Sequence, residues 1–192
     1  MADSEDAHLR EKKLASVEIL KGLFLHAFRD TVELPDGSQS TREYVVHPGA
    51  VVAVPMLDDG RLVLERQYRY PMGTVMIEFP AGKLDPGEDR LACAKRELLE
   101  ETGYSATQWA RAGVMHPVIS YSTEFIEVWF ARGLSQQQAA LDEGEFLEVI
   151  TATPAEVLQW CRDGTVTDAK TLTCALWLQN VLAGTWELDW RP

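Results

Sequence analysis

The spacing of apolar residues predicts strands in the first half of this 192-residue chain. Runs of strand length lie on both sides of two turn signals, residues 35–37 and 58–60, and both signals end in Asp-Gly. Asp-Gly between apolar runs is typical of a hairpin connection. The sequence therefore predicts two hairpins, one from strands at 23–34 and 41–47 and the other from strands at 50–57 and 61–68.

The second half mixes strands with helices. A short apolar strand at residues 75–79 precedes a helix that is predicted from near Glu88 to Gly103, where glycine suits a left-handed cap. Thr153 and Glu156 form the two ends of a predicted capping box. Further strands are predicted at 110–115, 125–132 and 146–152, and further helices from 154 to before Gly164 and at 169–182 behind Asp168.

This order of elements predicts an α+β fold, an α/β/α sandwich with a mixed β-sheet between helices. The pattern shows no internal repeat and no low-complexity linker, and the length fits one domain with a small appendage.

The net charge and the cysteines of the chain limit which kinds of partner and which compartment are expected. The net charge of −12 argues against nucleic acid or an anionic membrane. The same charge would repel an anionic substrate, unless a bound divalent cation offsets it locally. Cys93, Cys161 and Cys174 form no close metal-ligand pattern, and the first thirteen residues lack the apolar core of a signal peptide. We therefore expect reduced thiols and a cytoplasmic location.

The predicted helix that ends at Gly103 carries acidic and apolar residues on adjoining stripes. Steps of 100° per residue put Leu91, Ala94, Leu98 and Thr102 on one stripe and Glu97, Glu100 and Glu101 on the next. Like charges at this spacing cost an isolated helix a few tenths of a kcal/mol per pair, so the acidic stripe adds no helix stability. Taken alone, the stripe is most simply a solvated face, with a site for a hard cation as the alternative.

The residues around this stripe carry a family resemblance. The motif G-x5-E-x7-R-E-U-x-E-E-x-G-U, where U is bulky and apolar, is matched at Gly82, Glu88, Arg96, Glu97, Leu98, Glu100, Glu101, Gly103 and Tyr104. This motif is the Nudix box, so the chain resembles the Nudix hydrolases. The resemblance implies a Nudix fold, with an N-terminal β-strand extension over residues 1–47 and a hydrolase domain over residues 48–192.

The resemblance also implies hydrolysis of a nucleoside diphosphate linked to another group, assisted by Mg²⁺ with Mn²⁺ as a substitute. The ligands that it implies for the metal are the side chains of Glu97, Glu101 and Glu100 and the carbonyl of Ala81. Glu100 and Arg96 are also expected to serve catalysis, and Glu88 is expected to order the loop by pairing with Arg96.

Outside the box, the chain is similar to ADP-ribose pyrophosphatases and their sugar-nucleotide relatives. The similar segments are Gln67 to Tyr70, Glu78 to Gly82, Pro117, and Asp168 to Thr171. Arg69 is expected to contact substrate phosphates through its forked donors, and Glu78 to accept hydrogen bonds from ribose hydroxyls. The alternative is that these two residues only pair with neighbours at strand ends.

An acidic segment at residues 141–146 falls where related enzymes carry a mobile loop. The resemblance makes Glu143 the expected general base for the attacking water and Glu145 an additional metal ligand. A solvated loop tip is the alternative, and Glu124 is a rival for the base. His116 is expected to be structural, Trp160 and Trp177 to lie in the core or an interface, and the residue that stacks on adenine is left open among Tyr68, Tyr70, Phe24 and Phe28.

We therefore expect a homodimer, joined through its N-terminal strands, that hydrolyses ADP-ribose to AMP and ribose 5-phosphate. The expected partner is a small nucleotide sugar, with no nucleic acid or membrane. The alternatives are a pyrophosphatase of another nucleotide sugar, such as GDP-mannose or ADP-glucose, and a Nudix module that binds ADP-ribose without cleaving it. The sequence leaves open the number of metals and the phosphorus that is attacked.

Overall fold

The computed structural model describes residues 6–141, 144 and 146–192. The chain divides into two compact units, residues 1–48 with 118–124, and residues 49–117 with 125–192. Each unit is described by itself. The predicted boundary after residue 47 and the role of the N-terminal strands in dimerisation stay predictions.

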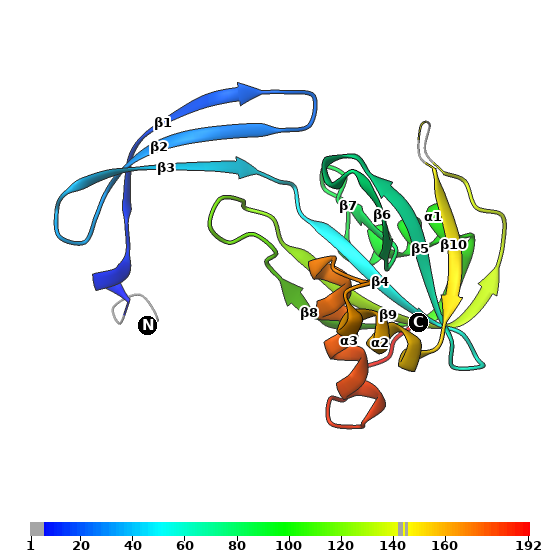
Figure 1. Ribbon diagram of the computed structural model, residues 1–192. Helices are drawn as coiled ribbons and strands as arrows, with labels where there is room; N and C mark the ends of the chain where they lie inside the picture. The colour runs from blue at the N-terminus through cyan, green and yellow to red at the C-terminus, as the bar shows by residue number, and fades with distance from the viewer. Residues whose placement is uncertain (1–5, 142–143, 145) are drawn as a thin grey trace. The chain divides into compact units, whose positions relative to one another are not determined.

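The first unit is built on a three-stranded antiparallel sheet (Figure 1). Its strands follow a short 3-10 turn, η1 (Ala7–Leu9), and are β1 (Lys12–Lys21), β2 (His26–Glu33) and β3 (Gln39–Val46), in the order β1-β2-β3. All ten residues of β1 are exposed. The sequence pattern missed β1 because its lysine, glutamate and apolar residues do not alternate as on a strand with one buried face.

The second unit contains a mixed sheet, as predicted, and this sheet has seven strands. Its path is β10-β5-β4-β9-β8, with β6 paired to β5 and β7 paired to β4. The β4 and β9 strands are parallel and the other neighbours are antiparallel. The strands are β4 (Ala50–Met56), β5 (Leu62–Arg69), β6 (Thr74–Glu78), β7 (Ala81–Lys83), β8 (Tyr104–Met115), β9 (Ile126–Gln136) and β10 (Leu147–Ala152), and a 3-10 turn, η2 (Tyr70–Met72), joins β5 to β6.

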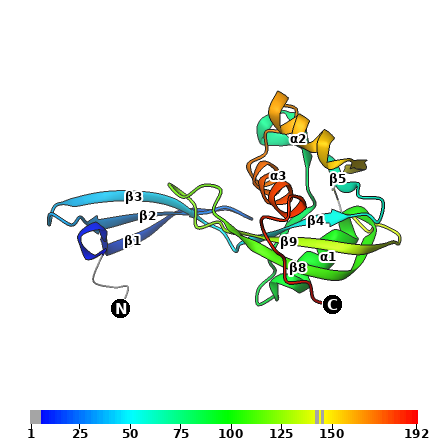
Figure 2. The ribbon, with the colours of Figure 1, turned by 90° about the horizontal axis from the view of Figure 1, so that it is seen from below.

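Helices cover both faces of this sheet (Figure 2). The α2 (Pro154–Asp163) and α3 (Ala169–Leu182) helices pack on one face, over a core that includes Leu64, Phe79 and Phe130. The α1 helix (Arg90–Thr102) packs on the other face through Cys93, Ala94 and Leu98. The predicted sandwich is therefore confirmed.

The predicted helix ends are confirmed at the caps that local chemistry specifies. The Thr153 hydroxyl accepts from the Glu156 N–H while the Glu156 carboxylate accepts from the Thr153 N–H, which completes the capping box. The Asp168 side chain accepts from the Thr171 N–H at the start of α3. Gly103 ends α1 in the left-handed region, with φ of 71°.

Other boundaries differ from the prediction. The α1 helix starts at Arg90 instead of near Glu88, because the Asp89 carboxylate accepts from the N–H groups of Leu91 and Ala92 and so makes Asp89 the N-cap. The β7 strand was missed because it is only three residues long and is defined by its pairing with β4. The β8 strand begins at Tyr104, since a mostly polar stretch there pairs with the end of β9.

Gly103 provides a test of this packing. A Cβ at Gly103 would lie 2.8 Å from the Gln137 carbonyl oxygen and 2.9 Å from the Ala139 nitrogen, both backbone atoms. Gly164 has the same left-handed conformation, with φ of 82°, but no described atom lies within 4 Å of its Cβ position. We expect Gly164→Ala to lower the free energy of unfolding by about 1 kcal/mol and Gly103→Ala by about 3 kcal/mol. Urea unfolding followed by tryptophan fluorescence measures both, and equal losses would contradict the packing argument.

Candidate active site

The acidic stripe of α1 is built as the helical spacing predicts. Ala94 and Leu98 are fully buried against the sheet, which turns the neighbouring stripe of glutamates toward the loop that precedes the helix. Glu101 is itself buried, with 4% of its surface exposed, while Glu97 and Glu100 are partly exposed. The stripe is therefore not a freely solvated face.

Strand β7 lies against these carboxylates. The Ala81 N–H donates to Glu101 Oε2 at 3.0 Å, which puts the Ala81 backbone beside that side chain. A Cβ at Gly82 would lie 1.8 Å from the carboxyl carbon of Glu97. Glycine is therefore needed at this position because the carboxylate approaches the backbone closely.

The Arg96 guanidinium holds the acidic groups together. It donates from Nε to Glu88 Oε1 at 2.9 Å, and from Nη1 to Glu97 Oε1 at 2.8 Å and Glu100 Oε2 at 3.0 Å. Glu88 also accepts from the Asp85 N–H at 3.0 Å, so the pair orders the loop between β7 and α1. The hydrogen bond from Arg96 lowers the pKa of Glu88 to about 2. The expected pairing of Glu88 with Arg96 is therefore present.

The end of α1 is also fixed from outside the helix. The Gln137 N–H donates to the Gly103 carbonyl at 2.6 Å, and the Ala140 N–H donates to the Glu100 carbonyl at 3.0 Å. Helices leave their last carbonyl groups without partners inside the helix, so the segment after β9 satisfies two groups at the turn that carries Glu100 and Glu101.

The chemistry of this donor set fits a hard divalent cation. Three carboxylates and the backbone of Ala81 offer the oxygen ligands that Mg²⁺ prefers. Within the described residues, no three acidic, histidine or cysteine side chains converge tightly enough to hold an ion as they stand. Arg96 instead engages one oxygen each of Glu97 and Glu100. Binding of an ion would therefore require these carboxylates to turn from Arg96.

Arg69 and Glu78, expected to contact substrate, pair with each other. Arg69 donates from Nε and Nη2 to the two oxygens of Glu78, at 2.7 and 2.9 Å. Lys170 at the start of α3 donates to Glu78 as well, and to Asp168 Oδ2 at 3.0 Å. Burial raises the pKa of Glu78, but the hydrogen bond from Arg69 and the charge of Lys170 bring it below its ordinary value. Glu78 is therefore ionised, and the contact with Lys170 was not foreseen.

Glu65 is a buried acid that the sequence analysis did not single out. It lies on β5 directly opposite Glu78 on β6 and has no exposed surface. No donor among the described residues bonds to either of its oxygens. Burial raises the pKa of Glu65 to about 7, although the charge of Lys170 opposes this shift. An acidic residue directly after the apolar run of residues 62–64 was the signal that could have found it.

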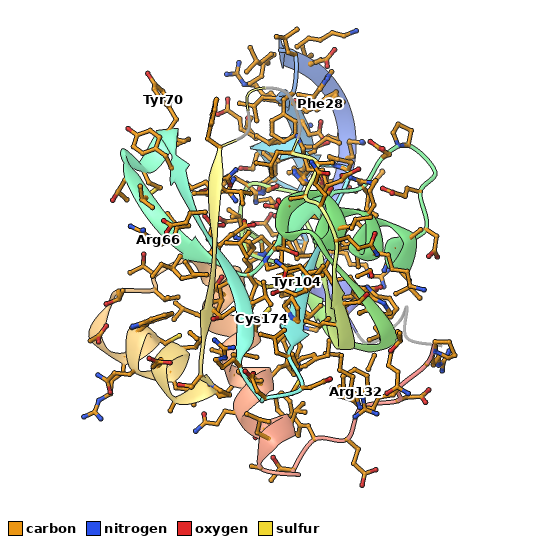
Figure 3. The ribbon with its side chains drawn as sticks, turned by 90° about the vertical axis from the view of Figure 1, so that its right-hand side faces the viewer. Phe28, Arg66, Tyr70, Tyr104, Arg132 and Cys174 are labelled. Carbon is orange, nitrogen blue, oxygen red and sulfur yellow. The ribbon has the colours of Figure 1, made fainter. Side chains whose placement is uncertain are left out.

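The residues considered for adenine stacking, together with His116 and Pro117, are divided between the two units. Tyr70 points away from the domain (Figure 3) and is 85% exposed, and Tyr68 is 56% exposed. In the other unit, Phe24 meets His47 edge to face and Phe28 stacks on Tyr44. His116 and Pro117 follow β8, and His116 is exposed.

Trp160 on α2 and Trp177 on α3 pack against the core, as predicted. Glu124 belongs to the first unit, where it pairs with His47 at 3.7 Å. Glu143 and Glu145, the expected base and the additional metal ligand, lie outside the described residues. Among the described helices, none combines the length and the apolar character that crossing a membrane requires.

Comparisons with known proteins agree with this geometry. The family model of the NUDIX domain matches residues 46–173, and that of the nucleoside diphosphate sugar hydrolase N-terminal domain matches residues 11–45. An ADP-ribose pyrophosphatase of Bacillus subtilis (strain 168) is 37% identical over 173 residues, which cover 89% of this chain and 94% of that protein. A methanol dehydrogenase activator of Bacillus methanolicus is 39% identical over 173 residues, which cover 88% of this chain and 92% of that protein.

A crystal structure of an ADP compounds hydrolase superimposes with a TM-score of 0.83 at 23% sequence identity, covering 92% of this chain and 96% of that one. At that identity the superposition supports the fold.

The low pKa of Glu88 makes a prediction about acid stability. Its pKa is about 2 in the folded protein against 4.5 for an ordinary glutamate, so its contribution to stability is complete above about pH 4.5 and is lost as the pH falls toward 2. We expect Glu88→Gln to lower the free energy of unfolding at pH 6 and to reduce its decline between pH 4.5 and pH 2. Urea unfolding at several pH values measures the slope, and an unchanged slope would show that Arg96 does not stabilise the ionised carboxylate.

Proposed function

The chain belongs to the Nudix hydrolase family, and we propose that within it this protein hydrolyses ADP-ribose to AMP and ribose 5-phosphate with Mg²⁺ as its cofactor. The site supports hydrolysis because its carboxylates lie against the backbone of β7 on a complete Nudix box. The B. subtilis relative supports the choice of substrate, because its name is ADP-ribose pyrophosphatase and the match spans nearly the whole of both chains.

In this proposal Glu97, Glu100, Glu101 and the Ala81 carbonyl would hold the cation. When bound, Mg²⁺ neutralises the diphosphate charge and polarises the P–O bond that breaks. Arg96 holds the carboxylates of Glu97 and Glu100 in place before the cation binds, and Glu88 keeps Arg96 directed at them.

The chemical step adds water across the diphosphate. A water oxygen bonds to one phosphorus as the bridging P–O bond breaks, and the bridging oxygen leaves with the other phosphate. We assign Glu143 as the base that takes the proton from water, and Glu145 as a further ligand of the cation.

Substrate recognition is assigned to Arg69 and Glu78. Their mutual pairing holds the Arg69 guanidinium in one orientation, and 38% of the Arg69 side chain is exposed, which leaves part of it accessible to a phosphate. Glu78 is almost completely buried, so its contact with a ribose hydroxyl would require the substrate to displace part of its present pairing.

The assembly is proposed to be a homodimer formed through the N-terminal strands. Apolar side chains on β1 are exposed, including Val17 at 61% and Ile19 at 45%. An edge strand with exposed apolar residues is a template for pairing with a second chain. We also propose a cytoplasmic location, since Cys93, Cys161 and Cys174 are free thiols.

Incubation with a panel of nucleotide sugars tests the activity. We expect AMP and ribose 5-phosphate in equal amounts from ADP-ribose with Mg²⁺, and slower turnover of ADP-glucose and GDP-mannose. Glu101→Gln should lower kcat/KM by about 10²-fold or more, because a ligand of the cation is lost. Glu148→Gln, which removes a carboxylate that pairs with Arg66 on the sheet, is the control and should leave the rate unchanged.

Faster turnover of GDP-mannose than of ADP-ribose would defeat the choice of substrate. Calorimetric binding of ADP-ribose without AMP formation would instead identify a binding module.

Light scattering during size-exclusion chromatography tests the dimer. We expect twice the mass of the 21.5 kDa chain for the wild type and a monomer for the double variant V17E/I19E, which puts two charges on β1. Lys95→Glu on α1 changes the net charge by the same amount and should remain dimeric. If both variants are dimers, β1 does not form the interface, and the proposed dimer is contradicted.

A further inference from the structure

Glu65 is an acid placed within the most buried part of the sheet. It follows Leu62 and Leu64 on β5, which pack into the core under α2 and α3. Successive side chains of a strand point to opposite faces, so Glu65 points to the face that α1 covers. Its position directly after the apolar run of residues 62–64 therefore directs a carboxylate toward the helix of the Nudix box.

The cationic side chains near Glu65 donate their hydrogen bonds to other groups. Arg69 uses Nε and Nη2 on Glu78, and Lys170 donates to Glu78 and Asp168. Neither oxygen of Glu65 accepts from a lysine, an arginine or a backbone N–H among the described residues, and none of its surface is exposed. Buried polar groups almost always have a partner, and an unpaired buried carboxylate is costly, so this one calls for an explanation.

The acidic group beside Glu65 on the helix is Glu101. The two carboxyl groups are close enough to share a proton, and only 4% of Glu101 is exposed. When both groups are ionised, the two carboxylates repel each other and neither can donate a hydrogen bond to the other. A divalent cation would remove this repulsion and satisfy oxygens of both groups at once.

We propose that Glu65 belongs to the cation site, as a carboxylate outside the Nudix box that raises the affinity for the divalent cation held at Glu101. The proposal rests on the proposed function only in that it requires a cation at the box. This role explains why the strand keeps an acid at a position with no exposed surface.

The test makes the same substitution, glutamate to glutamine, at two buried positions of the 192-residue chain. Glu127 on β9 is 2% exposed, but it accepts from Arg90 at 2.8 Å and from Arg111 at 2.8 Å. Glu65→Gln removes an unpaired carboxylate near the box, whereas Glu127→Gln removes a paired one. Binding of Mn²⁺ without substrate, measured by titration calorimetry, and urea unfolding with and without Mg²⁺ are the readouts.

We expect Glu65→Gln to be at least as stable as the wild type without metal and to bind Mn²⁺ about tenfold to a hundredfold more weakly. Glu127→Gln should lose stability and bind Mn²⁺ as the wild type does. A solely structural role for Glu65 would change the metal-free stability and leave Mn²⁺ affinity and the stabilisation by Mg²⁺ unchanged, and that result would overturn the proposal. Glu65→Met, with an apolar side chain of similar length, gives the same comparison if Glu65→Gln does not fold.

The two proposals fail in different ways. A wild type that binds Mn²⁺ but leaves ADP-ribose intact contradicts the proposed substrate and leaves the role of Glu65 standing. A wild type that hydrolyses ADP-ribose, together with a Glu65→Gln variant of unchanged Mn²⁺ affinity, contradicts the role of Glu65 alone.

Discussion

The arrangement of the site depends on the contacts of one guanidinium group. Without Arg96, the carboxylates of Glu97 and Glu100 would face each other on adjacent turns of α1 with no cation between them. Arg96 joins both to Glu88 in the preceding loop, so the same contacts that relieve repulsion also hold the loop against the helix. The position of the loop then determines where the backbone of Ala81 meets Glu101. The contacts of Arg96 therefore both neutralise Glu97 and Glu100 of α1 and set the position of the loop before the helix.

A second set of charges connects elements that are distant in sequence. Glu78 at the end of β6 accepts hydrogen bonds from Arg69 on β5 and Lys170 on α3, and Glu78 itself is buried. A buried acid with two cationic partners is satisfied, whereas removing one partner would leave an uncompensated charge and cost about 3–5 kcal/mol. This constraint fixes the segment that runs directly into β7. The position of β7 relative to α1 is thus determined from both of its ends.

The sequence predicted those features of the fold and the site that depend on interactions between residues close together in the chain. The caps at Thr153, Asp168 and Gly103 were predicted because each depends on residues within one turn of the helix. The stripe of glutamates followed from helical periodicity, and the Nudix box supplied its chemical meaning.

The features that were missed depend on pairing across the sheet. Strand β7 is defined by its backbone pairing with β4. Glu65 receives no hydrogen bond from Arg69 or Lys170 because these two side chains donate to Glu78 and Asp168. No local pattern encodes such choices between partners. An acid directly after an apolar run shows that the position is unusual, but it does not show which groups surround the acid, because these come from other strands and helices.

The bonds that close the end of α1 have a consequence for local unfolding. Helix ends normally fray first, and Glu100 and Glu101 lie in the last turn. Because Gln137 and Ala140 donate to carbonyl groups of this turn, fraying would also have to release the segment after β9. The last turn of α1 and the segment after β9 should therefore open together, so the amides of this turn should exchange with solvent deuterium more slowly than those of a helix end without outside partners.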